Sequence, residues 1–139
     1  MKDKIFADTN IVLDLLLERN PFYKASARLF SAAELNKVQI SFSSLGFSIL
    51  EHVISRQINK SKSKNALRKF RPLVKILAVD EKTIDYALNS DFRDFEDAIQ
   101  NEVAIQNNQD LIVSRNIKDF KNSVIPVMTP EDFIRIKNL

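Results

Sequence analysis

The stretch KIFADTNIVLDLL, residues 4–16, decides the fold. It begins with a short apolar run, Ile5 to Ala7, of the kind that forms a buried strand. Asp8 closes that run, and Thr9 and Asn10 follow with N-cap chemistry for a helix. Because Thr9 and Asn10 are available as caps, helix capping does not explain the acid at position 8. We therefore expect the Asp8 carboxylate to face a crevice at the end of the strand.

Short apolar runs and helical patterns continue to alternate along the rest of the chain. Further strands are expected over residues 38–42, 74–79, 111–113 and 126–128. Helices are expected over residues 22–35, from 44 to 53, 60–70, from 80 to about 88, 95–105 and from 129 onward. This alternation predicts a single α/β domain over residues 1–139, with a mainly parallel sheet covered by helices on both faces. In such sheets ligands bind at the carboxyl ends of the strands.

The composition removes most kinds of catalytic chemistry. The 139 residues include no cysteine, one histidine and one glycine. This excludes thiolate chemistry, multi-histidine metal cages and Gly-rich phosphate loops. The histidine, His52, lies on an apolar-periodic helix, where a structural role is expected. No run is apolar enough to span a bilayer or to act as a signal peptide, so a soluble, cytoplasmic protein without membrane contacts is expected.

Positive and negative charges are segregated along the sequence, although the net charge is only +3. Residues 52–79 contain no acid, whereas residues 80–110 hold half of the 18 acids. RNA backbones bind basic surfaces largely through counterion release. The RNA-binding candidates are Lys60, Lys62, Lys64 and Arg68 in the basic stretch, with Arg115 and Lys118 nearer the acids. The alternative interpretation of the basic stretch is a solvated helix face that confers solubility.

Acidic residues recur where predicted strands end or helices begin. Asp8 follows the first strand, Asp94, Glu96 and Asp97 surround the start of a helix, and Asp119 follows a later strand. Taken singly, acids at helix starts are better explained as caps and dipole partners, with Asp8 as the exception. Brought together they would repel each other, and a hard cation with oxygen ligands, Mg²⁺ or Mn²⁺, relieves that repulsion. The constellation therefore predicts a metal site.

Three segments resemble the signature motifs of PIN domains, in particular those of the single-domain bacterial VapC-type toxins. They are FADTNIVLDLL (6–16), DFEDAIQ (94–100) and VSRNIKDF (113–120). The stretch PVMTPEDF (126–133) is similar to the usual ending of that subgroup. The segments lie in the family's order and together span nearly the whole chain.

The resemblance implies a three-layer α/β/α sandwich with a five-stranded parallel sheet, and a Mg²⁺- or Mn²⁺-dependent endoribonuclease. It assigns metal binding and catalysis to Asp8, Asp97 and Asp119. It assigns accessory roles around them to Thr9, Asn10, Asp94, Glu96, Ser114 and Asn116. It also implies the toxin of a type II toxin–antitoxin pair, with RNA as substrate, a cognate antitoxin as partner and a homodimeric state.

One departure from the family pattern concerns the helix expected from residue 44. The family often carries a glutamate there, and that position falls on Ile49 in this sequence, with Glu51 two residues later. Two residues turn a helix by about 200°, so Glu51 points away from the direction of Ile49. Either the helix register differs and Glu51 is the ligand, or the site lacks this carboxylate.

Two other function classes remain open from the sequence. A degraded relative would keep the fold as a non-catalytic RNA-binding or protein-interaction module. A Mg²⁺-binding receiver-like signalling domain would need paired acids after the first strand, where Thr9 and Asn10 follow Asp8, and Asp80 is its only plausible phosphate acceptor.

Overall fold

The computed structural model describes residues 2–139 and places five strands in one parallel sheet. The strands are β1 (Asp3–Ala7), β2 (Val38–Ser43), β3 (Lys75–Leu77), β4 (Leu111–Val113) and β5 (Val127–Met128). Their order across the sheet is β3-β2-β1-β4-β5, so β1 is central and adjoins β4. The predicted α/β fold with about five parallel strands is confirmed.

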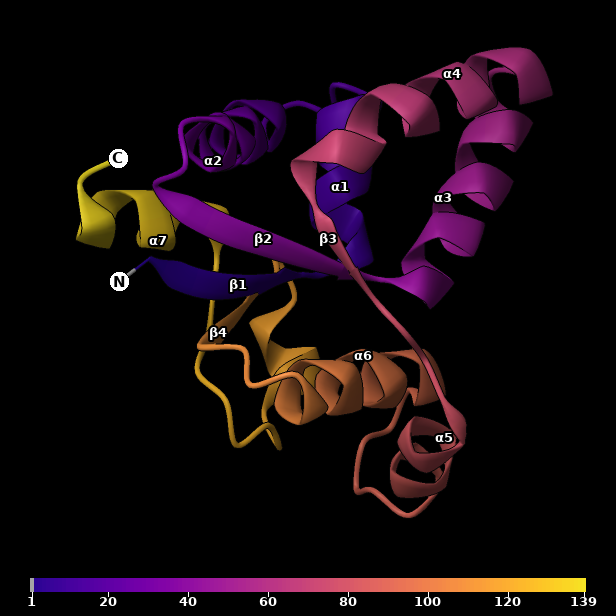
Figure 1. The fold of residues 1–139 in the computed structure, drawn as a ribbon, viewed down its shortest axis with the longest axis vertical. Helices are drawn as coiled ribbons and strands as arrows, with labels where there is room; N and C mark the ends of the chain where they lie inside the picture. The colour runs from indigo at the N-terminus through magenta and orange to yellow at the C-terminus, as the bar shows by residue number, and fades with distance from the viewer. Residues whose placement is uncertain (1) are drawn as a thin grey trace.

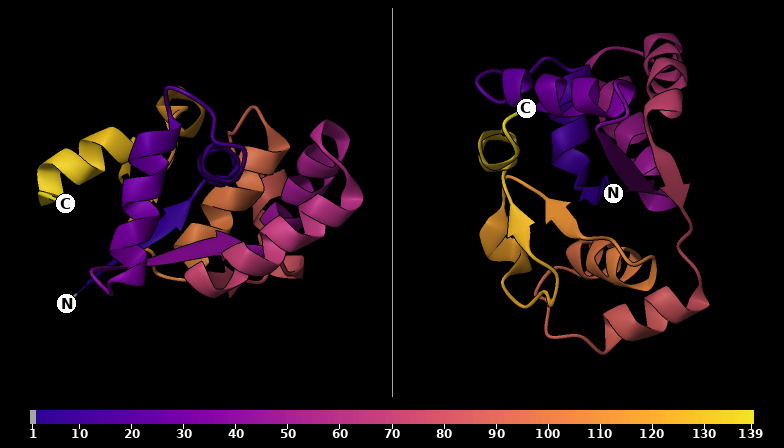
Figure 2. Two further views of the ribbon diagram at one scale, coloured as in Figure 1. Left: turned by 90° about the horizontal axis from the view of Figure 1, so that it is seen from above. Right: turned by 60° about the vertical axis from the view of Figure 1, so that its left-hand side comes forward.

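Helices cover both faces of this sheet. The α-helices are α1 (Thr9–Leu16), α2 (Tyr23–Glu34), α3 (Ser44–Gln57), α4 (Lys60–Phe70), α5 (Glu81–Leu88), α6 (Phe95–Gln106) and α7 (Pro130–Lys137), with 3₁₀ segments η1 (Arg71–Leu73) and η2 (Ile117–Phe120). Helices α1 to α4 lie on one side of the sheet and α5 and α6 on the other (Figure 1), and two further views show the same layers (Figure 2). Within residues 2–139, no helix has the length and hydropathy to cross a membrane.

The central strands are buried from both sides, which explains their unbroken apolar sequence. In β1, Ile5 and Ala7 contribute to the apolar cluster under α1 to α4, whereas Phe6 contributes to the cluster under α5 and α6. In β4, Leu111 and Val113 face the first cluster and Ile112 the second. This two-residue alternation determines which side chains of each strand point to each face of the sheet.

Most helices begin at a polar residue whose side chain accepts a hydrogen bond from the first turn. These N-caps are Asp8, Ser43, Asn59, Asp80, Asp94 and Thr129. The prediction that Thr9 and Asn10 cap α1 is wrong. The chain is still extended at Asp8, with φ −66° and ψ 148°, so Asp8 occupies the cap position and Thr9 is the first helical residue. Asp8 therefore caps α1 and also lies at the end of the strand.

The strand predicted over residues 74–79 is shorter in the structure. Its partner β2 ends at Ser43, which pairs with Leu77, and the chain then turns into α3. Beyond Leu77 no neighbouring strand is left to pair with, and the Val79 amide donates instead to the Ser44 hydroxyl at 3.2 Å.

Gly46 lies where α3 crosses an aromatic cluster. A Cβ at this position would fall onto the ring of Phe42, well inside van der Waals contact. Phe42 is fully buried and packs edge-on against Phe47 and Phe70, with ring centroids 5.4 and 5.7 Å away. The ring is therefore held on several sides and has little room to move.

Gly46→Ala is expected to destabilise the protein by about 1–3 kcal/mol, the usual cost of overpacking a tight core. This cost outweighs the gain of about 1 kcal/mol that alanine normally brings to a helix. Urea denaturation followed by circular dichroism measures the change, with Ser48→Ala on the exposed side of the same helix as the matched control. A stabilised Gly46→Ala variant would contradict the crowding.

Candidate active site

Three acids from separate segments lie at the carboxyl edge of the sheet. Asp8 directly follows β1, Asp97 is in the first turn of α6, and Asp119 is in η2 after β4. β1 and β4 are neighbours, with Ala7 paired to Val113, so the chain segments that leave them start side by side. The acids influence one another electrostatically: the carboxylate of Asp119 raises the pKa values of both Asp8 and Asp97. The structure thus brings together the three acids that the sequence singled out.

Asp8 is held in one orientation. One carboxylate oxygen accepts from the Thr9 amide at 2.8 Å, and the other accepts from the Ser114 hydroxyl at 2.8 Å. The Ser114 hydroxyl in turn accepts from the Asn116 amide at 3.0 Å. Burial raises the pKa of Asp8, although both hydrogen bonds act in the opposite direction. Asp8 is therefore a fixed and desolvated acid, and Ser114 is the residue that aims it.

Asp97 lies in a field of like charge. Partial burial, followed by the carboxylates of Asp8, Asp94, Asp119 and Glu96, raises its pKa to about 7. Burial and the charges of Asp94 and Asp8 also raise the pKa of Glu96. Asp94 caps α6 by accepting from the Asp97 amide at 2.9 Å. The first turn of α6 thus adds accessory carboxylates to the three main acids.

The chemistry of these donors fits a hard divalent cation. Carboxylates, supported by the Thr9 and Ser114 hydroxyls, are the ligands that Mg²⁺ and Mn²⁺ favour, and a cation would relieve the repulsion that raises the pKa of Asp97. Among residues 2–139, no three acidic or histidine side chains already stand at ligand spacing. Asp97 and Asp119 accept no side-chain hydrogen bond from the described residues, so no such bond has to break for either carboxylate to turn toward Asp8.

The remaining accessory candidates surround Asp8. Thr9 is buried, and its hydroxyl lies 3.5 Å from the amide nitrogen of Gln100 on α6. Asn10 is half-buried in the first turn of α1, and Asn116 is exposed after β4. Gln100, which the sequence analysis did not single out as a site residue, links α6 to the start of α1. Apart from its place in the 94–100 segment, nothing in the sequence marks this glutamine as a site residue.

Raised carboxylate pKa values make the metal-free protein less stable as the pH rises. The pKa of Asp97 is about 7 when folded and about 3.9 when unfolded, so the folded state binds more protons between these values. The melting temperature of the metal-free protein should therefore fall from pH 5 to pH 8, and Asp97→Asn should reduce that fall. Differential scanning fluorimetry in EDTA measures it, with the exposed Asp85→Asn as control. Identical pH profiles for wild type and Asp97→Asn would contradict the electrostatic picture.

A buried ion pair anchors the loop that carries Ser114. Asp14 on α1 is fully buried, and its oxygens lie 2.6 Å from Nε and 3.1 Å from Nη2 of Arg115. Arg19 approaches the same carboxylate at 3.7 Å, and the Arg115 guanidinium stacks 3.9 Å from the centre of the Phe22 ring. The guanidinium of Arg115, a candidate for RNA binding, is thus already bound by Asp14 and stacked on Phe22. This role is not visible in the sequence, because Asp14 and Arg115 are 101 positions apart.

Asp14→Asn is expected to lower the free energy of unfolding by about 3 kcal/mol, because it leaves a partly buried guanidinium without its carboxylate. The matched control is Asp132→Asn, which breaks the exposed pair with Arg135 and should cost less than about 1 kcal/mol. Chemical denaturation of both variants gives the comparison. Equal costs for the two variants would show that the Arg115 pair adds nothing beyond an ordinary surface contact.

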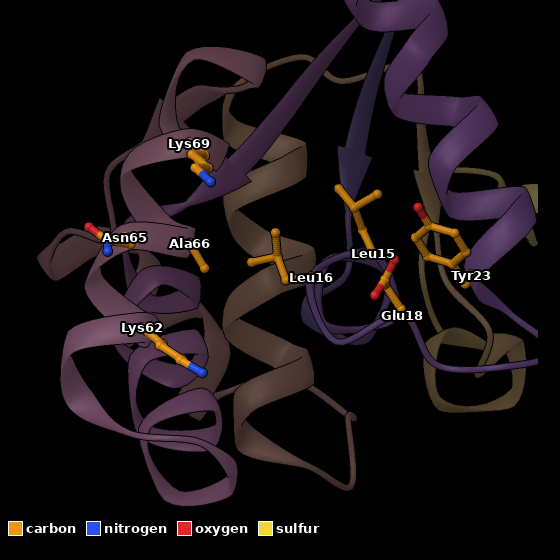
Figure 3. A pocket seen from close by; sticks show the side chains of 8 residues that line it. All are labelled: Leu15, Leu16, Glu18, Tyr23, Lys62, Asn65, Ala66 and Lys69. Carbon is orange, nitrogen blue, oxygen red and sulfur yellow. The ribbon is translucent and has the colours of Figure 1, made fainter.

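The other basic candidates lie on α4, away from the acids. Lys60, Lys62, Lys64 and Arg68 are exposed, and α3 and α4 form a hairpin that starts from the carboxyl end of β2 (Figure 1). Lys62 lines a hollow of about 450 Å³ with Leu16 and Ala66, between the end of α1 and α4 (Figure 3). Glu51 is half-buried on α3 and His52 is exposed, and neither side chain forms an ion pair in the described part of the chain.

A second hollow, of about 360 Å³, adjoins the acids. Its lining residues are Phe92, Arg93, Asp94, Asp97, Lys118, Asp119, Lys121 and Asn122. Lys118 is thus the RNA-binding candidate that the structure brings next to the acids. Arg93 and Lys121 were not singled out in the sequence, because each lies in an unremarkable polar segment.

The receiver-like alternative is contradicted by the structure. Receiver-type sheets have the strand order 2-1-3-4-5, whereas this sheet has the order 3-2-1-4-5. The candidate acceptor Asp80 caps α5 and accepts from both the amide and the hydroxyl of Thr83, and these hydrogen bonds lower its pKa. Asp80 is therefore a structural residue and does not belong to the acidic site.

Comparisons with known proteins agree with this fold. Ribonuclease VapC1 of Aquifex aeolicus is 27% identical over 136 residues, which cover 94% of this chain and 93% of the relative. The DNA-bound VapBC of Salmonella typhimurium superposes with a TM-score of 0.71 at 14% identity, covering 92% of this chain and 98% of that one. Mycobacterium tuberculosis VapC20, a sarcin-ricin loop cleaving toxin, superposes with a TM-score of 0.64 at 17% identity, covering 78% and 86%.

A family model also matches this chain over most of its length. A model of the PIN domain matches residues 4–118, from the start of β1 into η2. That range contains Asp8 and Asp97 and ends directly before Asp119. The chain matches this model over most of its length, and it has the parallel sheet and the converging acids described above. It therefore belongs to the PIN domain family.

Proposed function

We propose that this protein is a divalent-metal-dependent endoribonuclease, the toxin of a type II toxin–antitoxin pair. The observation that carries the proposal is the convergence of Asp8, Asp97 and Asp119 at one edge of the sheet, where burial and the like charge of neighbouring carboxylates raise the pKa of Asp97 to about 7. The kinship with a relative named as a ribonuclease supports RNA as the substrate. Metal dependence is inferred from the donor set.

In this proposal Asp8, Asp97 and Asp119 would hold Mg²⁺ or Mn²⁺. The ion would supply a water of lowered pKa and would stabilise charge on the scissile phosphate. Ser114 and the Thr9 amide keep the Asp8 carboxylate aimed at the crevice. Asp97 retains a proton up to about pH 7 in the metal-free protein, so metal binding competes with that proton and should strengthen as the pH rises.

Glu96 is our choice for the accessory carboxylate in place of the family glutamate on α3. It is close enough to Asp8 for the charge of Asp8 to raise its pKa. Glu51 forms no hydrogen bond or ion pair with a site residue in the described structure, and the proposal does not depend on it.

The partners proposed here are RNA, a cognate antitoxin and a second copy of the chain. Solved structures with this fold include toxin–antitoxin complexes such as VapBC2 of Rickettsia felis, bound to a promoter DNA fragment. The exposed basic residues of α4 stand on a hairpin that begins at the carboxyl edge of the sheet, and we propose them as an outer RNA surface.

Asp8→Asn is expected to reduce RNA cleavage by more than about 100-fold, since a catalytic cation contributes several kcal/mol and each 1.4 kcal/mol is tenfold in rate. The asparagine keeps an oxygen to cap α1, so the circular dichroism spectrum should not change. Cleavage of a fluorescent RNA is measured with Mg²⁺, with Mn²⁺ and with EDTA, and Asp85→Asn is the control on exposed α5.

Three results would contradict the proposal. Cleavage by Asp8→Asn at the wild-type rate would remove Asp8 from the site, and cleavage that persists in EDTA would remove the metal. RNA binding without any cleavage by wild type in Mn²⁺ would favour the non-catalytic module instead.

A further inference from the structure

The hollow beside the acids contains cations as well as carboxylates. Arg93 lies just before α6, and Lys118 and Lys121 lie in and directly after η2. The ion pairs found within residues 2–139 all involve other cations: Arg19, Arg115, Arg135 and Lys137. Arg93, Lys118 and Lys121 therefore form no ion pair with the carboxylates of the hollow within the described residues.

Three aspartates, Asp94, Asp97 and Asp119, line the same hollow, and none of them forms an ion pair within residues 2–139. Carboxylates without a cationic partner suit a metal ion, and the cations beside them suit an anion. A lining of both kinds favours a ligand that is itself an anion bound next to a cation.

The two basic walls are joined rigidly. The Phe92 ring next to Arg93 packs edge-on against the buried Phe120 ring of η2, with centroids 6.0 Å apart. The Asn122 side-chain amide donates to the Asp91 carbonyl at 3.2 Å. These contacts tie the segment before α6 to the segment that carries the two lysines, so the hollow is part of the fold and does not depend on ligand to form.

The charge of the hollow depends on the metal. Its three aspartates and three cations balance when all are ionised, so a polyanion gains little by entering the metal-free hollow. A divalent cation held by the aspartates would leave a positive excess. The volume of about 360 Å³ is at the lower end of the range for small-ligand pockets and suits one unpaired nucleotide better than a duplex.

We propose that Arg93, Lys118 and Lys121 form a subsite for the phosphate of the nucleotide next to the scissile bond, an inference that rests on the proposed function. The subsite takes a nucleotide from single-stranded or looped RNA. It is separate from the basic residues of α4, which would contact the RNA backbone farther from the cut.

The test compares Arg93→Gln/Lys121→Gln with a control of equal charge change, Lys24→Gln/Lys37→Gln. The control residues are exposed on or just after α2, on the opposite side of the sheet. Steady-state cleavage of an unstructured RNA in Mn²⁺ should show KM raised about tenfold by the subsite variant, with kcat changed less than twofold. Each lost phosphate contact should also reduce the slope of log affinity against log salt by about 0.7.

Two further measurements do not depend on cleavage. Binding of 5′-AMP at saturating Mn²⁺, followed by calorimetry, should weaken about tenfold in the subsite variant and should not change in the control or in Lys60→Gln/Lys62→Gln/Lys64→Gln. Mn²⁺ affinity without nucleotide should not weaken in any of them, because the acids are intact.

Equal KM, salt slope and 5′-AMP affinity in the subsite variant and its control would overturn the subsite, even with metal-dependent cleavage intact. Weakened Mn²⁺ binding in the subsite variant would also overturn it, since the residues would then act on the metal site. Failure of the proposed function is distinct, because wild type would then not cleave RNA in Mn²⁺, while 5′-AMP binding would still test the subsite.

Discussion

The hydrogen bond from Ser114 to Asp8 joins the ends of two neighbouring parallel strands, and the candidate site is assembled around it. A buried carboxylate is costly unless its oxygens are satisfied, and here one partner comes from α1 and the other from the loop after β4. That requirement fixes the relative position of two segments that are far apart in sequence. The carboxylates of Asp97 and Asp119 accept no hydrogen bond from the described residues and so lack a comparable restraint.

The site therefore has a rigid half and an adjustable half. Arg115 extends the rigid half by holding buried Asp14, so adjacent residues of one loop bind the N-cap acid of α1 and an acid within the helix. On the other half, the acids of α6 repel one another, and this repulsion works against the metal-free fold. A protein that uses a cation gains from this arrangement, because relief of the repulsion adds to the affinity for the ion.

The sequence was sufficient to predict the parallel sheet and the position of nearly every helix, because apolar runs and polar caps are local signals. It also pointed to Asp8, Asp97 and Asp119, as acids at strand ends and helix starts. It failed where a role depends on contacts that are distant in sequence. Asp14 is an interruption in an apolar stretch until Arg115 is seen beside it, and β3 is shorter than its apolar run because β2 ends first.

Helix α1 has eight residues, too few for a stable helix on its own in water. It is secured at its beginning by Asp8 and near its end by Asp14, and both acids bind consecutive residues of the loop after β4. Fraying at either end of the helix would break one of these contacts and expose a carboxylate. Helix and loop are therefore expected to open together or not at all, as one cooperative unit in amide hydrogen exchange.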